Sequence, residues 1–298
     1  MQHQFLQSLQ QINHSLSLAR LSVEKYQPYL YIPMNYFPGC NNNKTGKLRR
    51  MMTIKLVARF GLISPSIIAK LYNIPYRLAL EHLNKLVKEQ LLCLVVTHRS
   101  MDGRVYILDY AGAKYAEELL SIAIYFRSSE PSLRVNQNTV MHDLMMQYLL
   151  IKGLHHISKS GDETPLWLSY VTEPEFKRMF KSNDIRNVDA IAIEPDGSVA
   201  AVEMEHSFKT KASRQTILLK WLYGLKHGFY DKVMLFSHSL NVLNDIKRLH
   251  VELHQEMPQR YDKATKLPVL TEEDVNLLKQ NVIYRTVYCS ELNDVFYG

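Results

Sequence analysis

The segment Asn187–Glu205, NVDAIAIEPDGSVAAVEME, decides the fold of the second half of the chain, because two apolar runs flank the turn Pro195-Asp196-Gly197. A three-residue loop of this composition favours a β-hairpin, with Pro and Asp central in a type I turn and Gly in a left-handed conformation. The runs Ala190–Ile193 and Val199–Val202 contain no polar residue, which is typical of strands buried on both faces. We therefore expect a hairpin inside a protein core.

The turn also determines which residues of the hairpin face one another. If Glu194 pairs with Ser198, then Asp189 lies opposite Glu203, and Glu205 shares the face of Glu203 because side chains alternate along a strand. Three uncompensated carboxylates repel one another, and a divalent cation resolves that repulsion. A metal so held can activate water and neutralise charge on a phosphodiester. Asp189, Glu203 and Glu205 are therefore the expected metal ligands and catalytic residues.

The metal expected at this hairpin is Mg²⁺ or Mn²⁺, since both prefer oxygen ligands. The alternative is an edge hairpin whose acidic residues face water. The apolar character of both strands favours the metal site over that alternative.

A second informative region, Met51–Asp109, predicts three helices followed by a hairpin. Asp102-Gly103 is a strong hairpin signal, and Ser64-Pro65 is a helix cap followed by Pro at the first helical position. The expected helices are Met52–Phe60, Pro65–Leu71 and Tyr76–Gln90, and the expected strands are Leu91–Thr97 and Arg104–Leu108.

This order of elements resembles the winged helix-turn-helix family over about sixty residues. The resemblance implies that the third helix enters the major groove of DNA and that the hairpin contacts the backbone or the minor groove. The expected DNA-binding residues are Arg77 and Lys85 of the third helix and Arg99 and Arg104 of the hairpin. Winged helices also serve as protein-interaction modules, which is the alternative interpretation.

The distribution of charge favours nucleic acid as the partner. Residues 1–120 contain 15 Lys and Arg against 7 Asp and Glu, a net charge of +8, whereas residues 121–298 contain 21 against 22, a net charge of −1. A basic segment binds polyanions by releasing their counterions. A basic surface that only improves solubility is the alternative.

The hairpin Asn187–Glu205 resembles the PD-(D/E)xK restriction-endonuclease-like superfamily, in which a hairpin presents an Asp and then Glu-x-Lys to the metal. Asp189 and Glu203 take the first two places, but Val188 replaces the Pro of the motif and Glu205 occupies the position of the lysine. Either Glu205 acts as general base, or a cation from the following segment replaces the lysine. The candidates for that cation are Lys209, Lys211, Arg214 and Lys220, each of which is alternatively a solvated helix charge.

Three further features resemble the replication-relaxation family, to which the MobC/TraX-like plasmid relaxases are related. They are His142-Asp143-Leu144 at the start of a helix, Glu173 after a strand containing Trp167, and the Glu-x-Glu hairpin before a helix with Lys and Tyr. The resemblance implies a metal-dependent endonuclease, a relaxase that nicks one DNA strand at a plasmid or integrative-element transfer origin during conjugation. The residues expected to support the site are His142, Asp143, Glu173, Lys211 and Lys220.

The expected partners are the origin DNA and accessory mobilisation and coupling proteins. The alternative function is a non-catalytic DNA-binding regulator or replication accessory protein that uses the nuclease-like domain as a scaffold. A third hypothesis is a defence or repair endonuclease of the same fold, which cuts both strands.

The expected fold class is α/β (α+β), an N-terminal winged helix-turn-helix followed by a restriction-endonuclease-like three-layer α/β domain. Residues 1–50 are interpreted as an N-terminal helix and a mobile basic loop at Gly39–Lys47, residues 51–127 as the winged-helix domain, and residues 128–298 as the nuclease-like domain. The linker is placed at Ser128–Ser132. Later helices are expected at Asn138–Leu154, Glu173–Phe180, Lys211–Lys226 and Asn244–Gln255.

Composition bounds the remaining possibilities. The chain has 298 residues, 46% of them hydrophobic, which is enough for two globular domains. Its three cysteines, Cys40, Cys93 and Cys289, form no CxxC pair, so neither a disulfide framework nor a zinc site is expected. There is no secretory signal pattern and no apolar run of about 18 residues, so we expect a cytoplasmic protein that does not insert into membranes.

Overall fold

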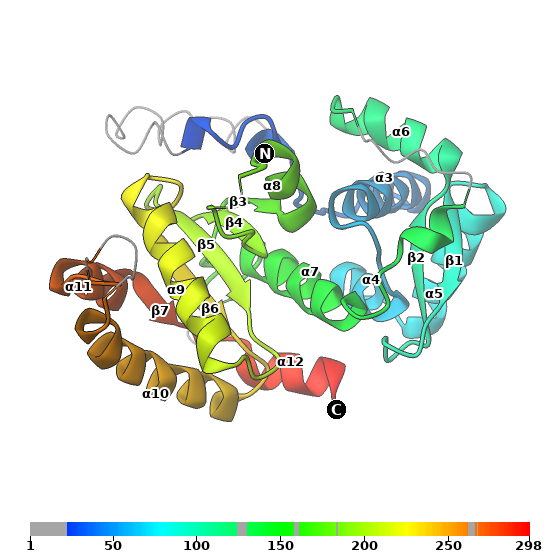
Figure 1. Ribbon diagram of the computed structural model, residues 1–298. Helices are drawn as coiled ribbons and strands as arrows, with labels where there is room; N and C mark the ends of the chain where they lie inside the picture. Colours follow the sequence, from blue (N-terminus) through cyan, green and yellow to red (C-terminus); the bar gives the residue numbers. More distant parts are fainter. Residues whose placement is uncertain (1–22, 124–129, 158–160, 183, 262–265, 267) are drawn as a thin grey trace. The chain divides into compact units, whose positions relative to one another are not determined.

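The computed structural model describes residues 23–123, 130–157, 161–182, 184–261, 266 and 268–298. The protein is a mixed α/β protein with two β-sheets in this part of the chain (Figure 1). The described chain divides into two compact units, which we call the helix-hairpin unit (residues 28–175 and 297) and the sheet unit (residues 23–27, 176–296 and 298). The division falls at 175/176, whereas the sequence-based boundary is at 127/128.

The helix-hairpin unit contains the expected helices and hairpin. Its elements are η1 Tyr29–Tyr31, α3 Asn42–Phe60, α4 Pro65–Tyr72, α5 Tyr76–Lys88, β1 Leu92–Val96, β2 Arg104–Leu108, α6 Tyr110–Leu120, η2 Pro131–Arg134, α7 Val140–Leu154 and β3 Ser169–Thr172. Strands β1 and β2 pair antiparallel, with Val96 opposite Arg104. The expected positions of α4, α5, β1, β2 and α7 are confirmed to within a few residues. Helix α8, Glu173–Met179, crosses the division between the units.

Local sequence explains why α3 and α4 are separate helices. Gly61 ends α3 with a left-handed backbone, φ 90°, which glycine adopts without steric cost. Ser64 then caps α4 by accepting a hydrogen bond from the backbone of Ile67, and Asn73 ends α4 in the left-handed region, φ 48°. The helix-turn-helix order is thus encoded by caps.

The expectation of a mobile basic loop at Gly39–Lys47 is wrong, because α3 begins at Asn42. The Asn41 side chain caps this helix by accepting a hydrogen bond from the backbone of Lys44 at 2.9 Å. The Gly39 amide also donates to the hydroxyl of Thr45 at 3.1 Å. Side-chain capping overrides the turn-rich composition that suggested a loop. Most of the expected N-terminal helix, and part of the expected linker, lie outside the described residues.

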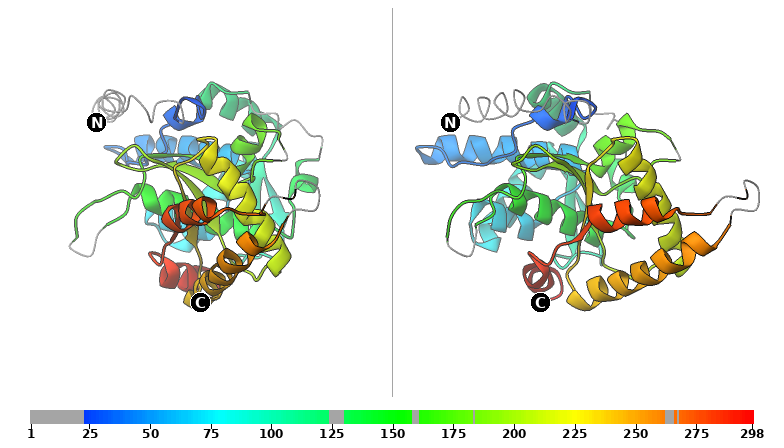
Figure 2. Two further views of the ribbon diagram at one scale, coloured as in Figure 1. Left: turned by 60° about the vertical axis from the view of Figure 1, so that its left-hand side comes forward. Right: turned by 90° about the vertical axis from the view of Figure 1, so that its left-hand side faces the viewer.

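The sheet unit is built on the hairpin expected from the sequence. Its elements are β4 Ala190–Ile193, β5 Val199–Met204, α9 Lys211–Lys226, β6 Lys232–Phe236, α10 Leu240–Glu256, η3 Met257–Gln259, α11 Glu272–Asn281, β7 Val282–Tyr284 and α12 Cys289–Phe296. These strands have the order β4-β5-β6-β7, with β4 antiparallel to β5, and β6 and β7 parallel to it. Helix α9 connects β5 to β6 and contacts α11. Two further views show α10 in gold and α11 in orange-red (Figure 2).

No helix in the described part of the chain combines the length and the apolar character that a membrane span requires.

A buried ion pair stabilises the helix-hairpin unit. The Arg59 guanidinium donates two hydrogen bonds of 2.8 Å to the carboxylate of Glu175 and a third, of 2.6 Å, to the carbonyl of Tyr170. Glu175 also accepts a hydrogen bond from the backbone of Thr172. Arg59 and Glu175 are both 2% exposed. Burial alone would lower the pKa of Arg59, but the charge of Glu175 raises it above its ordinary value.

Replacing Glu175 by Ala should lower the free energy of unfolding by about 3–5 kcal/mol, because it leaves the buried guanidinium of Arg59 without its anion. Urea unfolding followed by circular dichroism measures this loss. The matched control is Glu81→Ala, which opens the exposed Arg77–Glu81 pair and should cost about 0.5 kcal/mol or less. Similar losses in both variants would show that the buried pair has no special role.

Candidate functional site

The β4–β5 hairpin has the register expected from its turn. Ile193 lies opposite Val199, and Ala190 lies opposite Val202, so the register continues to Asp189 opposite Glu203. Gly197 has a φ of 86°, and its amide donates to the carbonyl of Glu194 at 2.9 Å. The turn residues therefore set the pairing of the hairpin, and the pairing places the carboxylates at its end.

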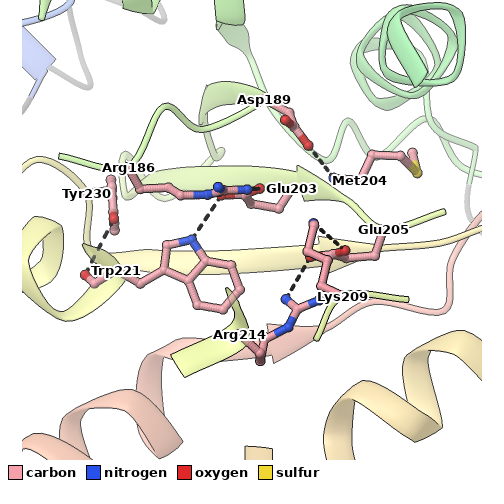
Figure 3. A network of polar contacts seen from close by, with 9 residues as sticks. All are labelled: Arg186, Asp189, Glu203, Met204, Glu205, Lys209, Arg214, Trp221 and Tyr230. Carbon is pink, nitrogen blue, oxygen red and sulfur yellow. Dashed lines mark hydrogen bonds and ion pairs between the residues drawn. The ribbon is translucent and has the colours of Figure 1, made fainter. Parts of the chain in front are cut away.

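Glu203 is held by two side chains in the core of the sheet unit. Arg186 donates from Nε to Oε1 at 2.8 Å and from Nη2 to Oε2 at 2.9 Å, in the forked geometry that makes Arg–carboxylate pairs strong. The indole of Trp221, on α9, donates to Oε1 at 2.9 Å. Glu203 is 1% exposed, and Figure 3 shows it between Arg186 and Trp221.

The pKa of Glu203 is nevertheless raised above its ordinary value. Burial is the largest cause, the nearby charge of Asp189 is the next, and Arg186 opposes both. The pKa of Arg186 is raised as well: burial would lower it, but the charge of Glu203 overcomes that effect. Negative charge at Glu203 is therefore disfavoured even with Arg186 in place, and further positive charge nearby would be stabilising.

Glu205 is compensated more completely than Glu203. Arg214 of α9 donates to Oε1 at 2.7 Å, and Lys209 donates to Oε2 at 2.6 Å. Burial alone would raise the pKa of Glu205, but the hydrogen bond and charge of Arg214, together with Lys209, hold it below its ordinary value. Glu205 is therefore ionised at neutral pH.

Asp189 interacts with the backbone of the facing strand. Its Oδ2 accepts a hydrogen bond of 2.8 Å from the amide of Met204 (Figure 3). Its charge contributes to the raised pKa of Glu203, so the two carboxylates influence each other. The register thus brings Asp189 and Glu203 together, while Glu205 has its own cations.

The three carboxylates are accompanied by three cations, Arg186, Lys209 and Arg214. The cluster that the sequence suggested to be uncompensated therefore has cations of the protein itself, one on Glu203 and two on Glu205. In the part of the chain that the structure describes, no group of three or more His, Cys, Asp or Glu side chains is arranged to hold a metal ion.

The donor atoms nevertheless fit a hard divalent cation in kind, because they are carboxylate oxygens. Side-chain exposure shows which ion pairs can open for it. The side chains of Arg186 and Lys209 are 23% and 30% exposed and border solvent, whereas that of Arg214 is 1% exposed and enclosed. A metal would thus be held by Asp189 and Glu203 after Arg186 moves.

A cavity of about 290 Å³ adjoins the Glu205 side of this network. It is lined by Phe208, Lys209, Arg214, Asp245, Ile246, Arg248, Leu249 and Glu252. The Nε of Arg214 is buried and has no hydrogen-bond partner among the described residues. Phe208 is 69% exposed beside it. The cavity thus adjoins the buried Arg214–Glu205 pair, and its wall also contains the carboxylates of Asp245 and Glu252.

The expected supporting residues are distributed over both units. Lys211 does not join the hairpin network, because it pairs with Glu256 of α10 at 2.5 Å. Lys220 lies on α9, next to Trp221. The remaining three belong to the helix-hairpin unit: His142 lies 3.5 Å from Asp143 on α7, and Glu173 begins α8. Their support of the hairpin site stays a prediction.

The expected DNA-binding residues lie on the surface of the helix-hairpin unit. Arg77 of α5 has a side chain 85% exposed and pairs with Glu81, and Lys85 is exposed on the same helix. Arg99 is exposed in the β1–β2 loop, and Arg104 begins β2.

Sequence reasoning missed two residues of the hairpin network, Arg186 and Trp221. Arg186 lies only three residues before Asp189, and a cation so close to an expected acidic site could have indicated an ion pair. Trp221 carried no such signal, because its contact with Glu203 depends on how α9 packs. Lys209 and Arg214, two of the cations that the sequence offered in place of the motif's lysine, both contact Glu205.

Comparison with protein-family models, with curated proteins and with solved structures gave no match.

Glu205→Gln should lower the free energy of unfolding by about 3 kcal/mol or more at neutral pH, because it leaves the buried Arg214 uncompensated. Glu203→Gln should lower it by less. Arg186, by contrast, can reach solvent. Since the pKa of Glu205 is lowered on folding, its stabilisation is present above the ordinary value of 4.5 and is lost as the pH falls through the folded value.

Urea unfolding of both variants and the wild type at about pH 7 and about pH 4 checks this prediction. The deficit of Glu205→Gln should shrink at the lower pH. A deficit that is larger for Glu203→Gln, or that grows with acidity, would contradict the assignment of Glu205 as the more strongly stabilised anion.

Proposed function

We propose that this protein is a DNA-binding protein that nicks one strand of DNA at the β4–β5 hairpin, with Mg²⁺ or Mn²⁺, as a relaxase at a transfer origin. The observation that carries the proposal is the hairpin register, which sets Asp189 opposite Glu203 and places Glu205 with Lys209 beside them. Carboxylates can hold the metal ion that activates water in metal-dependent phosphodiester cleavage.

The electrostatics of Glu203 support this proposal. Burial and the neighbouring charge of Asp189 raise its pKa, and a divalent cation shared by the two carboxylates would offset their repulsion. That cation would polarise a phosphodiester and acidify a water. Lys209, whose side chain is 30% exposed, would turn from Glu205 to a phosphate. The cavity beside Arg214 can hold the neighbouring nucleotide.

The helix-hairpin unit supports DNA binding. We propose that α4, α5, β1 and β2 act as a winged helix, with α5 in the major groove and the β1–β2 loop on the backbone. The loop is fixed to α4, because Asp102 accepts hydrogen bonds from the hydroxyl and the amide of Ser66, at 2.6 and 3.1 Å. A loop anchored in this way presents Arg99 and Arg104 in a constant position.

A second candidate function is a non-catalytic DNA-binding regulator or replication accessory protein. The observation that favours it is the pairing of both glutamates with cations in the described structure. If these ion pairs never open, the hairpin is a structural element, and the DNA-binding surface carries the function.

A supercoiled plasmid carrying the candidate origin should be converted to open circles by the wild type with Mg²⁺ or Mn²⁺, but not with EDTA. Asp189→Ala and Glu203→Ala should reduce nicking by at least about a hundredfold, because each removes a ligand of the metal that stabilises the transition state. Gel electrophoresis of the plasmid measures both forms.

The control is Glu272→Gln, which alters an exposed carboxylate on α11 of the same unit and should nick at the wild-type rate. Linear product would instead favour a double-strand endonuclease. Folded protein that retards DNA in a gel but does not nick it with either metal would favour the regulator.

Metal affinity provides a test that does not depend on activity. Arg186→Gln should tighten Mn²⁺ binding by about tenfold, or ~1.4 kcal/mol, because it removes the cation that competes for Glu203. Isothermal titration calorimetry measures the affinity. Arg260→Gln is the matched control, since it opens an Arg–Glu pair with Glu256, away from the hairpin, and should leave the affinity unchanged. Weaker or unchanged affinity in Arg186→Gln would identify the pair as structural.

A further inference from the structure

A second cavity, of about 480 Å³, lies in the helix-hairpin unit among α3, α5 and α6. It is lined by Asn42, Asn43, Gly46, Lys47, Arg50, His82, Lys85, Leu86 and Tyr115. No Asp or Glu is among these residues. The volume lies within the range of about 300–1,000 Å³ that is usual for small-molecule sites. The cavity includes the first turns of α3, from the segment whose sequence suggested a basic loop.

The charge of this cavity is strongly positive. Lys47 and Lys85 are both exposed, and neither forms an ion pair with a carboxylate of the described chain. Arg50 is already oriented, because its Nη2 donates to Glu89 at 2.7 Å. Two unpaired ammonium groups and a fixed guanidinium around one concave surface are suited to a phosphate group.

The same positive charges affect the pKa of His82. Its Nε2 lies 2.9 Å from the hydroxyl of Thr53, so the ring is fixed in the wall. Burial is the largest cause that lowers its pKa to about 4, and the charges of Arg49, Arg50 and Lys85 lower it further. His82 is therefore neutral at physiological pH, and the cations of the cavity are its Lys and Arg residues.

The uncharged lining residues are suited to a nucleobase. Tyr115 is half-buried and Leu86 is buried, and together they offer a flat and an apolar surface. Asn42 and Asn43 are exposed, and each amide provides donors and an acceptor for the edge of a base. The cavity thus combines cations with groups that can bind a ring.

We propose that this cavity binds a nucleotide, with its phosphate on Lys47, Arg50 and Lys85 and its base between Tyr115 and the asparagines. The site goes beyond the proposed function, because it is a cavity among α3, α5 and α6 that shares only Lys85 with the proposed DNA-binding residues. The nucleotide is either a free mononucleotide or one unit of a bound DNA strand, and these sources have the same chemistry.

Binding of ATP and of a short DNA duplex, both fluorescently labelled, to the full chain tests the proposal. Lys47→Ala should weaken ATP binding by about fivefold or more, because it removes a charge-assisted hydrogen bond to phosphate. Gly46→Gln should weaken it without any change of charge, because a side chain there projects into open space in the cavity wall.

Two matched variants serve as controls. Gly46→Ala adds a methyl group that meets no atom within 4 Å and should bind as the wild type does. Lys88→Ala removes an exposed charge from α5 outside the cavity, and it should also leave ATP binding unchanged.

The outcomes distinguish the two sources of the nucleotide. If Lys47→Ala and Gly46→Gln weaken the duplex as well, and unlabelled ATP displaces it, the occupant is a unit of the DNA strand. If they weaken only ATP, the occupant is a free nucleotide. Wild-type binding of both probes by both variants, or no ATP binding at all, would overturn the proposal. A protein that binds ATP but does not nick plasmid refutes the relaxase function alone.

Discussion

The sheet unit depends on the compensation of two buried glutamates on one strand. Glu203 and Glu205 are each 1% exposed, and a buried carboxylate without a partner would cost several kcal/mol. Glu203 is satisfied by Arg186 and Trp221, and Glu205 by Lys209 and Arg214. Because two of these partners lie on α9, the same contacts that neutralise the strand also fix the helix on the sheet. The contacts that stabilise the two buried glutamates are therefore also the contacts of the candidate site.

Much of this arrangement follows from local sequence. The Pro-Asp-Gly turn was sufficient to predict the β4–β5 register, and the bounds of α9 at Lys211–Lys226 were predicted without error, because apolar periodicity and turn geometry are local properties. The ion pairs were not predicted. Side chains of the Arg186 loop and of α9 meet Glu203 only after the chain has folded, and long-range contacts of this kind leave no periodic signal in the sequence.

In the Gly39–Lys47 segment, by contrast, the local structure itself was predicted wrongly. Its Asn and Gly residues are common in turns, so composition favoured a loop, yet the cap formed by Asn41 starts α3 within this segment. The difference matters for chemistry as well as for structure. A helix holds Asn43 and Lys47 on one face, as residues four apart, whereas a loop would not fix them relative to α5. The basic character of the segment was predicted, but its cavity was not.

The two halves of the hairpin site differ in how exposed their compensating cations are. Arg214 is enclosed, so the Glu205 half is closed by a cation that cannot leave without exposing a buried charge. Arg186 reaches solvent, and the pKa of Glu203 is raised despite it, so the Glu203–Asp189 half is closed by a cation that can be exchanged. Under the proposed function, Asp189 and Glu203 are the carboxylates whose compensating cation is the more exposed one. Glu205 is paired instead with both Arg214 and Lys209.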